Sequence, residues 1–157
     1  MFNPDFQPAQ YTLGPFQAAA QALVVEPIMA PVRSDTEIEA GIDGLGRERS
    51  GLFVVTDAFL SAHREKTIAA IGRNGEPTIS NDAHFGKQGG LLVYIERYID
   101  MFRGAVNYVD RILKGKAGDL PIQLSTRYEL QINLKTAKAL GLTVPAILQA
   151  TADEVTG

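Results

Sequence analysis

Residues 51–71, GLFVVTDAFLSAHREKTIAAI, join a short apolar run to a polar corner and then to a segment with helical spacing. The run from Leu52 to Val55 predicts a buried strand, and residues 58–71 predict a helix. A strand that ends at a capping residue and continues as a helix is the βα unit of a parallel sheet. Ligands bind just past the carboxyl ends of such strands, so Thr56 and Asp57 stand at the centre of any site.

The composition indicates a globular chain with no broad affinity for nucleic acid. Its 157 residues suffice for one domain, or for one lobe and part of another. Hydrophobic residues make up 45% and charged residues 21%, which excludes a disordered chain. A net charge of −3 leaves no basic field, so no nucleic-acid partner is expected. No apolar run approaches the roughly 20 residues that cross a bilayer.

The residues that usually carry metals, cofactors or covalent catalysis do not form a pattern here. There are no cysteines, and His63 and His84 do not stand at a familiar metal-ligand spacing. No phosphate-binding loop, dinucleotide fingerprint or nucleophile motif is present. We therefore expect no metal, no cofactor and no catalytic residue.

The first half of the chain alternates predicted helices and strands. These elements are a helix within residues 8–23 that begins near Gly14, an edge strand at 24–30, a helix opened by the capping box at 34–37, a charged turn at 46–50 and a strand at 77–80. The helix that starts at residue 58 should end at Asn74-Gly75. This alternation predicts an α/β fold with a doubly wound parallel sheet.

In the second half, Gly89-Gly90 breaks the chain before a predicted strand at residues 91–95. Residues 98–113 have the clearest amphipathic pattern in the sequence and predict a helix closed by Lys114-Gly115. The remaining predicted elements are a loop at 116–124, a strand at 128–132, a helix at 134–140 and a last helical turn at 145–150.

Motifs in a fixed order carry a resemblance to a known family. They are NYVDRILKG at 107–115, DLP at 119–121 and YELQINLKTAKALGL at 128–142, with shorter matches NPD at 3–5, VVTD at 54–57 and QGGL at 88–91. Together these segments resemble the substrate-binding proteins of ABC transporters, of the tryptophan/tyrosine type. The resemblance runs over nearly the whole chain and implies the type I periplasmic-binding fold.

The resemblance also implies a domain organisation. Proteins of this family have two lobes, and this chain resembles only their second half, with Met1 inside the first strand of the second lobe. Residues 1–85 would then form the second lobe, and residues 86–157 would be a crossover strand, a helix and a C-terminal segment that pack on an absent first lobe. The chain is expected to be a truncated binding protein. Asn81-Asp82-Ala83-His84 departs from a more aromatic, proline-led stretch of close relatives.

The function that the resemblance implies is binding, and no enzymatic activity is expected. A small organic solute, such as an amino acid or an aromatic acid, would be held in a cleft between lobes and delivered to a membrane permease. The family is periplasmic; the sequence shows no signal peptide, so the chain would be cytoplasmic if expressed as written. Without a first lobe, residues 91–113 should either form a homodimer or repack onto the second lobe.

Polar residues at the predicted strand ends are the candidate ligand-binding set: Asn3, Asp5, Thr56, Asp57, Asn81, Asp82 and His84. Each has a purely structural alternative. Thr56 or Asp57 suits a helix N-cap, Asn3-Pro4-Asp5 suits an Asx-type turn, and residues 81–84 suit a solvated hinge loop.

A second function class stays open on the residues alone. A small flavodoxin-like enzyme or signalling domain could use Asp57 as an acid, base or acceptor, because a fold does not determine a function. Against it, no base, nucleophile or phosphate cradle accompanies Asp57 in the sequence.

Overall fold

The computed structural model of the chain describes residues 1–45, 50–115, 118, 120–121, 123 and 125–157. Its elements, in chain order, are α1 (Gln7–Ala22), α2 (Asp35–Asp43), β1 (Leu52–Val54), α3 (Ala58–Ala62), α4 (Arg64–Asn74), β2 (Thr78–Ser80), α5 (Ala83–Lys87), β3 (Leu92–Glu96), α6 (Tyr98–Leu113), β4 (Tyr128–Asn133), α7 (Leu134–Ala139), α8 (Ala146–Thr151) and β5 (Glu154–Thr156). Residues 46–49 of the predicted turn, and residues 116–117, 119, 122 and 124 of the predicted loop, lie outside the described residues.

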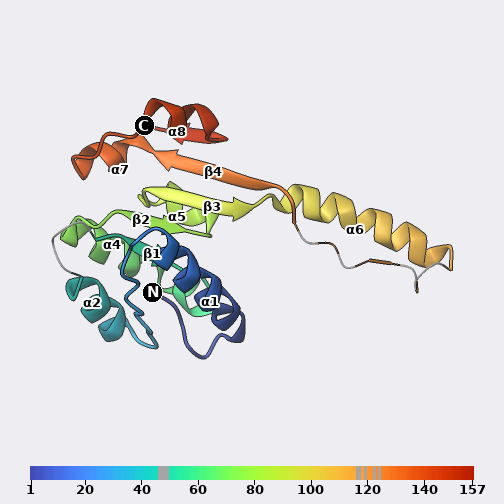
Figure 1. The fold of residues 1–157 in the computed structure, drawn as a ribbon, viewed down its shortest axis with the longest axis horizontal. Helices are drawn as coiled ribbons and strands as arrows, with labels where there is room; N and C mark the ends of the chain where they lie inside the picture. Colours follow the sequence, from blue (N-terminus) through green and yellow to red (C-terminus); the bar gives the residue numbers. More distant parts are fainter. Residues whose placement is uncertain (46–49, 116–117, 119, 122, 124) are drawn as a thin grey trace.

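The strands form one sheet in the order β1-β2-β3-β4-β5. The pairs β1–β2 and β2–β3 are parallel, β3–β4 is antiparallel, and β4–β5 is parallel again (Figure 1). The predicted α/β class is confirmed. The sheet is mixed where a wholly parallel one was predicted, because the chain leaves the sheet along α6 and returns as β4 in the opposite direction.

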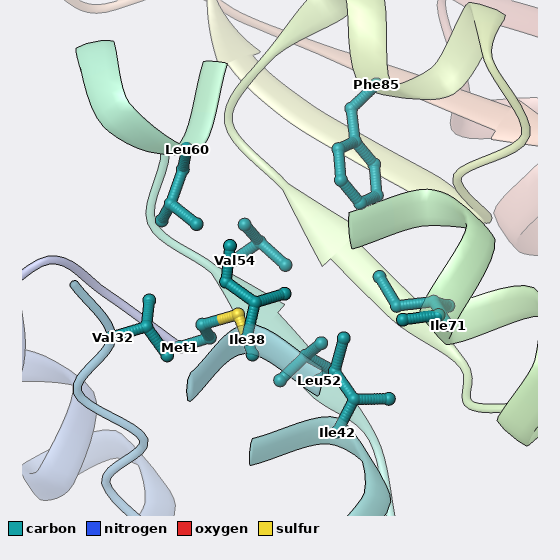
Figure 2. Packing of buried hydrophobic residues seen from close by; sticks show 10 residues of the cluster. Met1, Val32, Ile38, Ile42, Leu52, Val54, Leu60, Ile71 and Phe85 are labelled. Atoms are coloured by element: carbon teal, nitrogen blue, oxygen red, sulfur yellow. The ribbon is translucent and has the colours of Figure 1, made fainter. Parts of the chain in front are cut away.

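Helices cover both faces of the β1 end of the sheet. Leu52 and Val54 point into a cluster with Ile38 and Ile42 of α2 and with Ile71 of α4 (Figure 2). The alternate residues Phe53 and Val55 contact a smaller cluster under α1. Successive side chains of a strand face opposite sides, so this division is the three-layer arrangement of a doubly wound domain.

Met1 and Phe2 lie beside β1 in a strand-like conformation. The Met1 amino group donates to the Phe53 carbonyl at 2.6 Å, and the Val55 N–H donates to the Met1 carbonyl at 3.0 Å. Phe2 forms a parallel bridge with Pro31 on its other side. Burial lowers the pKa of the Met1 α-amino group to about 6. The prediction that these two residues end a strand is supported by this pairing.

Two predictions for residues 1–30 were wrong. The helix α1 begins at Gln7, seven residues before the predicted start, because Pro8 already takes the first-turn position and Pro15 is accommodated inside the helix. No strand forms at residues 24–30. Val24 has a φ of 57°, which a β-branched residue rarely adopts, and the pairing with Phe2 involves Ala30 and Val32 instead.

The predicted helix at 58–71 is interrupted at His63. The ring of His63 packs on Phe59 at a centroid distance of 4.4 Å, and its Nδ1 contacts the carboxylate of Asp35 in α2. The backbone there leaves helical dihedrals, with φ −98° and ψ 14°, so α3 and α4 are separate elements. The elements α5 and β5 were not predicted. The other predicted strands and helices lie within two residues of their observed bounds.

The sheet is continuous across residues 85 and 86. The strand β2 pairs directly with β3 across this point, and β4 and β5 extend the same sheet. Among the helices and strands of the described residues, α6 alone leaves the body of the fold, and it extends beyond the end of β3 (Figure 1). None of its described residues is buried, so the predicted repacking of this helix onto the lobe does not occur.

Gly90 provides a test of how tightly α5 packs against the start of β3. A Cβ added at Gly90 would lie 2.8 Å from Phe85 Cε1 and 2.9 Å from the Phe85 carbonyl oxygen. Phe85 is 2% exposed and has little room to move. We expect Gly90→Ala to lower the free energy of unfolding by about 1–3 kcal/mol, measured by urea denaturation.

The matched control is Gly72→Ala in α4, where nothing lies within 4 Å of the added Cβ. That variant should be more stable than the wild type by about 0.5–1 kcal/mol, since alanine favours a helix interior. Equal stability of the two variants would contradict the packing described.

Candidate functional site

A pocket of about 500 Å³ opens at the carboxyl ends of β1, β2 and β3. The parallel pairing of these strands brings their ends to one edge of the sheet, where each is followed by polar residues. The residues that line the pocket are Thr56, Asp57, Ser61, Arg64, Asn81, Asp82, Ala83, His84, Ile95 and Tyr98.

Hydrogen bonds join the end of β1 to the end of β2. The Thr56 N–H donates to Asn81 Oδ1 at 2.9 Å, and the hydroxyls of Thr56 and Ser80 lie 3.0 Å apart. Ser80 is completely buried and its Oγ accepts from the Asp82 N–H at 3.2 Å. The polar edge is therefore fixed by the sheet itself, which suits a site that must hold its shape.

Asp57 is the N-cap of α3. Its Oδ1 accepts from the Leu60 N–H at 2.8 Å, and its Oδ2 accepts from Asn3 Nδ2 at 2.8 Å. The residue is only 8% exposed. The capping alternative is thus confirmed for Asp57: Oδ1 caps α3, and Oδ2 is occupied by the Asn3 amide.

Asp82 has the same double role at the start of α5. Its Oδ1 accepts from the His84 N–H at 2.9 Å, and its Oδ2 accepts from Arg64 Nη1 at 2.9 Å. Arg64 also donates through Nε to Gln88 at 2.9 Å. The side chains of Arg64 and Asp82 are 21% and 12% exposed, so this ion pair is partly shielded from water.

The structure places Thr56, Asp57, Asn81, Asp82 and His84 together in the pocket. Asn3 lies behind Asp57 and positions it, without lining the pocket. Asp5 is elsewhere: it pairs with Arg33 at 3.0 Å on the surface, and its N–H donates to Asn3 in the predicted Asx-type turn. The loop alternative for residues 81–84 holds for Asn81 and Asp82 only, because α5 begins at Ala83.

Sequence reasoning missed five residues of the pocket: Ser61, Arg64, Ala83, Ile95 and Tyr98. Ser61 and Arg64 follow the capped corner at helical spacing, so their side of α3 and α4 could have been derived from the position of Asp57. Ile95 and Tyr98 come from β3 and the start of α6, and only the pairing of β2 with β3 brings them near.

Two other grooves are as large as this pocket. One, of about 560 Å³, runs along α6, and the other, of about 570 Å³, lies at the opposite edge of the sheet between α4 and α7. Neither is lined by residues at the carboxyl ends of the parallel strands β1, β2 and β3. Within the described ranges, no three acidic, histidine or cysteine residues are placed to hold a metal ion, and no helix is long and apolar enough to cross a membrane.

Comparison with known families gives one match. The family described as ABC transporter substrate binding protein matches residues 1–156. No curated protein matches the chain.

Solved structures with the same fold include three bacterial proteins, each 19% identical to this chain. A conserved domain protein from Vibrio cholerae superposes with a TM-score of 0.85, over 99% of this chain and 53% of that one. The ABC domain from Streptococcus pneumonia in complex with L-Trp also gives 0.85, over 98% and 52%. CD0873, a substrate binding protein with adhesive properties from Clostridium difficile, gives 0.76 over 99% and 52% in its ligand-free, open structure. The chain thus spans about half the length of the structures that it matches.

The capping role of Asp57 predicts a large effect on stability. Replacing it by alanine removes the N-cap of α3 and leaves the Asn3 amide without its acceptor. We expect Asp57→Ala to lower the free energy of unfolding by about 1–3 kcal/mol in urea denaturation.

Asp5→Ala is the control, since Asp5 makes an exposed ion pair with Arg33. Its effect should stay within about 0.5 kcal/mol. If both variants unfold at the wild-type urea concentration, Asp57 does not stabilise the corner.

Proposed function

This chain belongs to the family of ABC transporter substrate-binding proteins, and we propose that it supplies one wall of a solute-binding cleft. The observation that carries the proposal is the pocket of about 500 Å³ at the carboxyl ends of β1, β2 and β3. Its polar groups come from rigid strand ends and capped helices, as is typical of sites that bind small molecules. The solute proposed is a small organic molecule, such as an amino acid or an aromatic acid.

The proposed role is capture and delivery without chemistry on the solute. Solute binding would favour a closed form, which docks on a membrane permease in the periplasm. Family membership supports this partner and this compartment. The alternative of an enzyme or signalling domain that uses Asp57 is disfavoured, because both oxygens of Asp57 already accept hydrogen bonds from the protein.

L-Trp is a suitable probe because it is the ligand in the structure from Streptococcus pneumonia. This chain contains no tryptophan, so the fluorescence of the probe can be excited selectively. One wall buries less of a solute than the 70–90% that a complete pocket buries, so we expect a dissociation constant of about 1 mM or weaker. Amide shifts in NMR titrations should concentrate at Thr56, Ser61 and Asn81.

Shifts confined to the groove along α6 would argue against the proposed cleft wall. Micromolar binding by a monomer of this chain would show that a single wall suffices, contrary to the proposal.

The exposed apolar stripe of α6 supports a proposal about self-association. Near the middle of the helix, Phe102 and Val106 are 68% and 66% exposed. Near its two ends, Ile99 and Leu113 are 58% and 82% exposed. We propose that the isolated chain forms a homodimer through residues 91–113. An antiparallel pair of α6 helices centred between residues 105 and 106 would place Phe102 opposite Val109 of the second copy, with both on the apolar stripe.

This homodimer predicts that Phe102→Glu yields a monomer, because a charge would enter the apolar interface. Light scattering at micromolar concentration measures the mass. Tyr11→Glu, at a residue of α1 that is 82% exposed, is the control and should remain dimeric. A monomeric wild type would refute the proposal.

A further inference from the structure

We propose that the pocket wall formed by Thr56, Arg64 and Asn81 receives a carboxylate group of the solute. The inference rests on the proposed function and adds the orientation of the solute and the residues that recognise it. It follows from which hydrogen-bonding groups of the pocket are already used by the protein and which are left over.

The carboxylate oxygens of the pocket and the Asn81 amide oxygen each already accept a hydrogen bond from the protein. Each oxygen of Asp57 accepts one hydrogen bond, from the Leu60 N–H and from Asn3 Nδ2, and each oxygen of Asp82 accepts one, from the His84 N–H and from Arg64. The Asn81 Oδ1 accepts from the Thr56 N–H. The two carboxylates are also little exposed, so an ammonium group of a solute has poor access to them.

The hydroxyl proton of Thr56 is directed away from Ser80. Ser80 is completely buried, and its oxygen already accepts from the Asp82 N–H. A buried hydroxyl needs a partner for its own proton, and the Thr56 oxygen, 3.0 Å away, is the acceptor at hand. Ser80 therefore donates to Thr56, which leaves the Thr56 proton for a group in the pocket.

Two more donors face the same space. The Asn81 amide is oriented by the Thr56 N–H, which requires the oxygen of the amide, so its Nδ2 group remains for the solute. Arg64 uses two of its five N–H groups, on Asp82 and on Gln88. Its side chain is 21% exposed against 12% for Asp82, so the more accessible charge of this ion pair is the positive one. Three donors, one of them an accessible guanidinium, suit a carboxylate.

Matched indole probes separate the two ends of an amino acid. Indole-3-propionate carries the carboxylate without an amine, and tryptamine carries the amine without a carboxylate. NMR titration of the isotope-labelled chain, together with probe fluorescence, measures the dissociation constant of each probe; the chain itself contains no tryptophan. We expect indole-3-propionate to bind at least tenfold more tightly than tryptamine, with the largest shifts at Thr56, Arg64 and Asn81.

Two variants test the residues. Arg64→Gln removes the charge and frees the carboxylate of Asp82, and Asn81→Asp replaces the donor by an anion at an exposed position while keeping the acceptor for Thr56. Each should weaken indole-3-propionate at least fivefold and strengthen tryptamine. The control is Arg73→Gln. Arg73 lies on the same helix as Arg64, and its exposed ion pair is with Glu39 of α2, so this variant should change neither affinity.

The outcomes are distinct. If the wild type binds tryptamine as tightly as indole-3-propionate, or more tightly, the carboxylate assignment is overturned and the proposed solute-binding wall is not. The same holds if Asn81→Asp lowers the affinity for both probes equally. If no probe shifts the pocket residues, the proposed function fails and this inference fails with it. If Arg64→Gln does not fold, the test is whether Asn81→Asp weakens the binding of indole-3-propionate and strengthens that of tryptamine.

Discussion

Parallel pairing of β1, β2 and β3 is the constraint on which the rest of the structure depends. The register that sets Val54 opposite Ser80 and Ser80 opposite Val93 brings three strand ends to one edge. Only then can the Thr56 N–H reach Asn81 and can Arg64 reach Asp82. Helices on both faces bury the strands and leave this edge open, so the packing that stabilises the lobe also creates the pocket.

Local signals in the sequence were sufficient for much of the fold. Ser34, Asp57 and Gly75 end or begin helices as their residue types predict, because capping needs only a few neighbouring backbone groups. Features set by distant contacts were missed. The break at His63 coincides with its contact to Asp35 of α2, and Phe2 pairs with Ala30 and Val32 where a strand at 24–30 was predicted. For the same reason Thr56 and Asp57 could be placed in the pocket from sequence, whereas Tyr98 could not.

Structural and binding roles are not alternatives at this edge. Asp57 and Asp82 each cap a helix through Oδ1, and their Oδ2 atoms accept from Asn3 and Arg64, so both carboxylates are held in place. These bonds together influence which polar groups remain for a solute. A carboxylate that looks like a ligand contact in a sequence can act on the ligand mainly through the donors, such as Arg64, that it orients.

The helix α6 begins at the pocket and ends far from it. Tyr98 lines the pocket, and the helix continues for 16 residues to Leu113, about 24 Å at 1.5 Å per residue. At its base, Arg97 is paired with the backbone of Arg127 and with Glu129, close to where β3 and β4 part. Because the helix is long and joined to the sheet at one end, a rotation of α6 by about 10° at Tyr98 would displace Leu113 by about 4 Å. A small adjustment around a solute would thus be magnified into a movement large enough for another protein surface to detect.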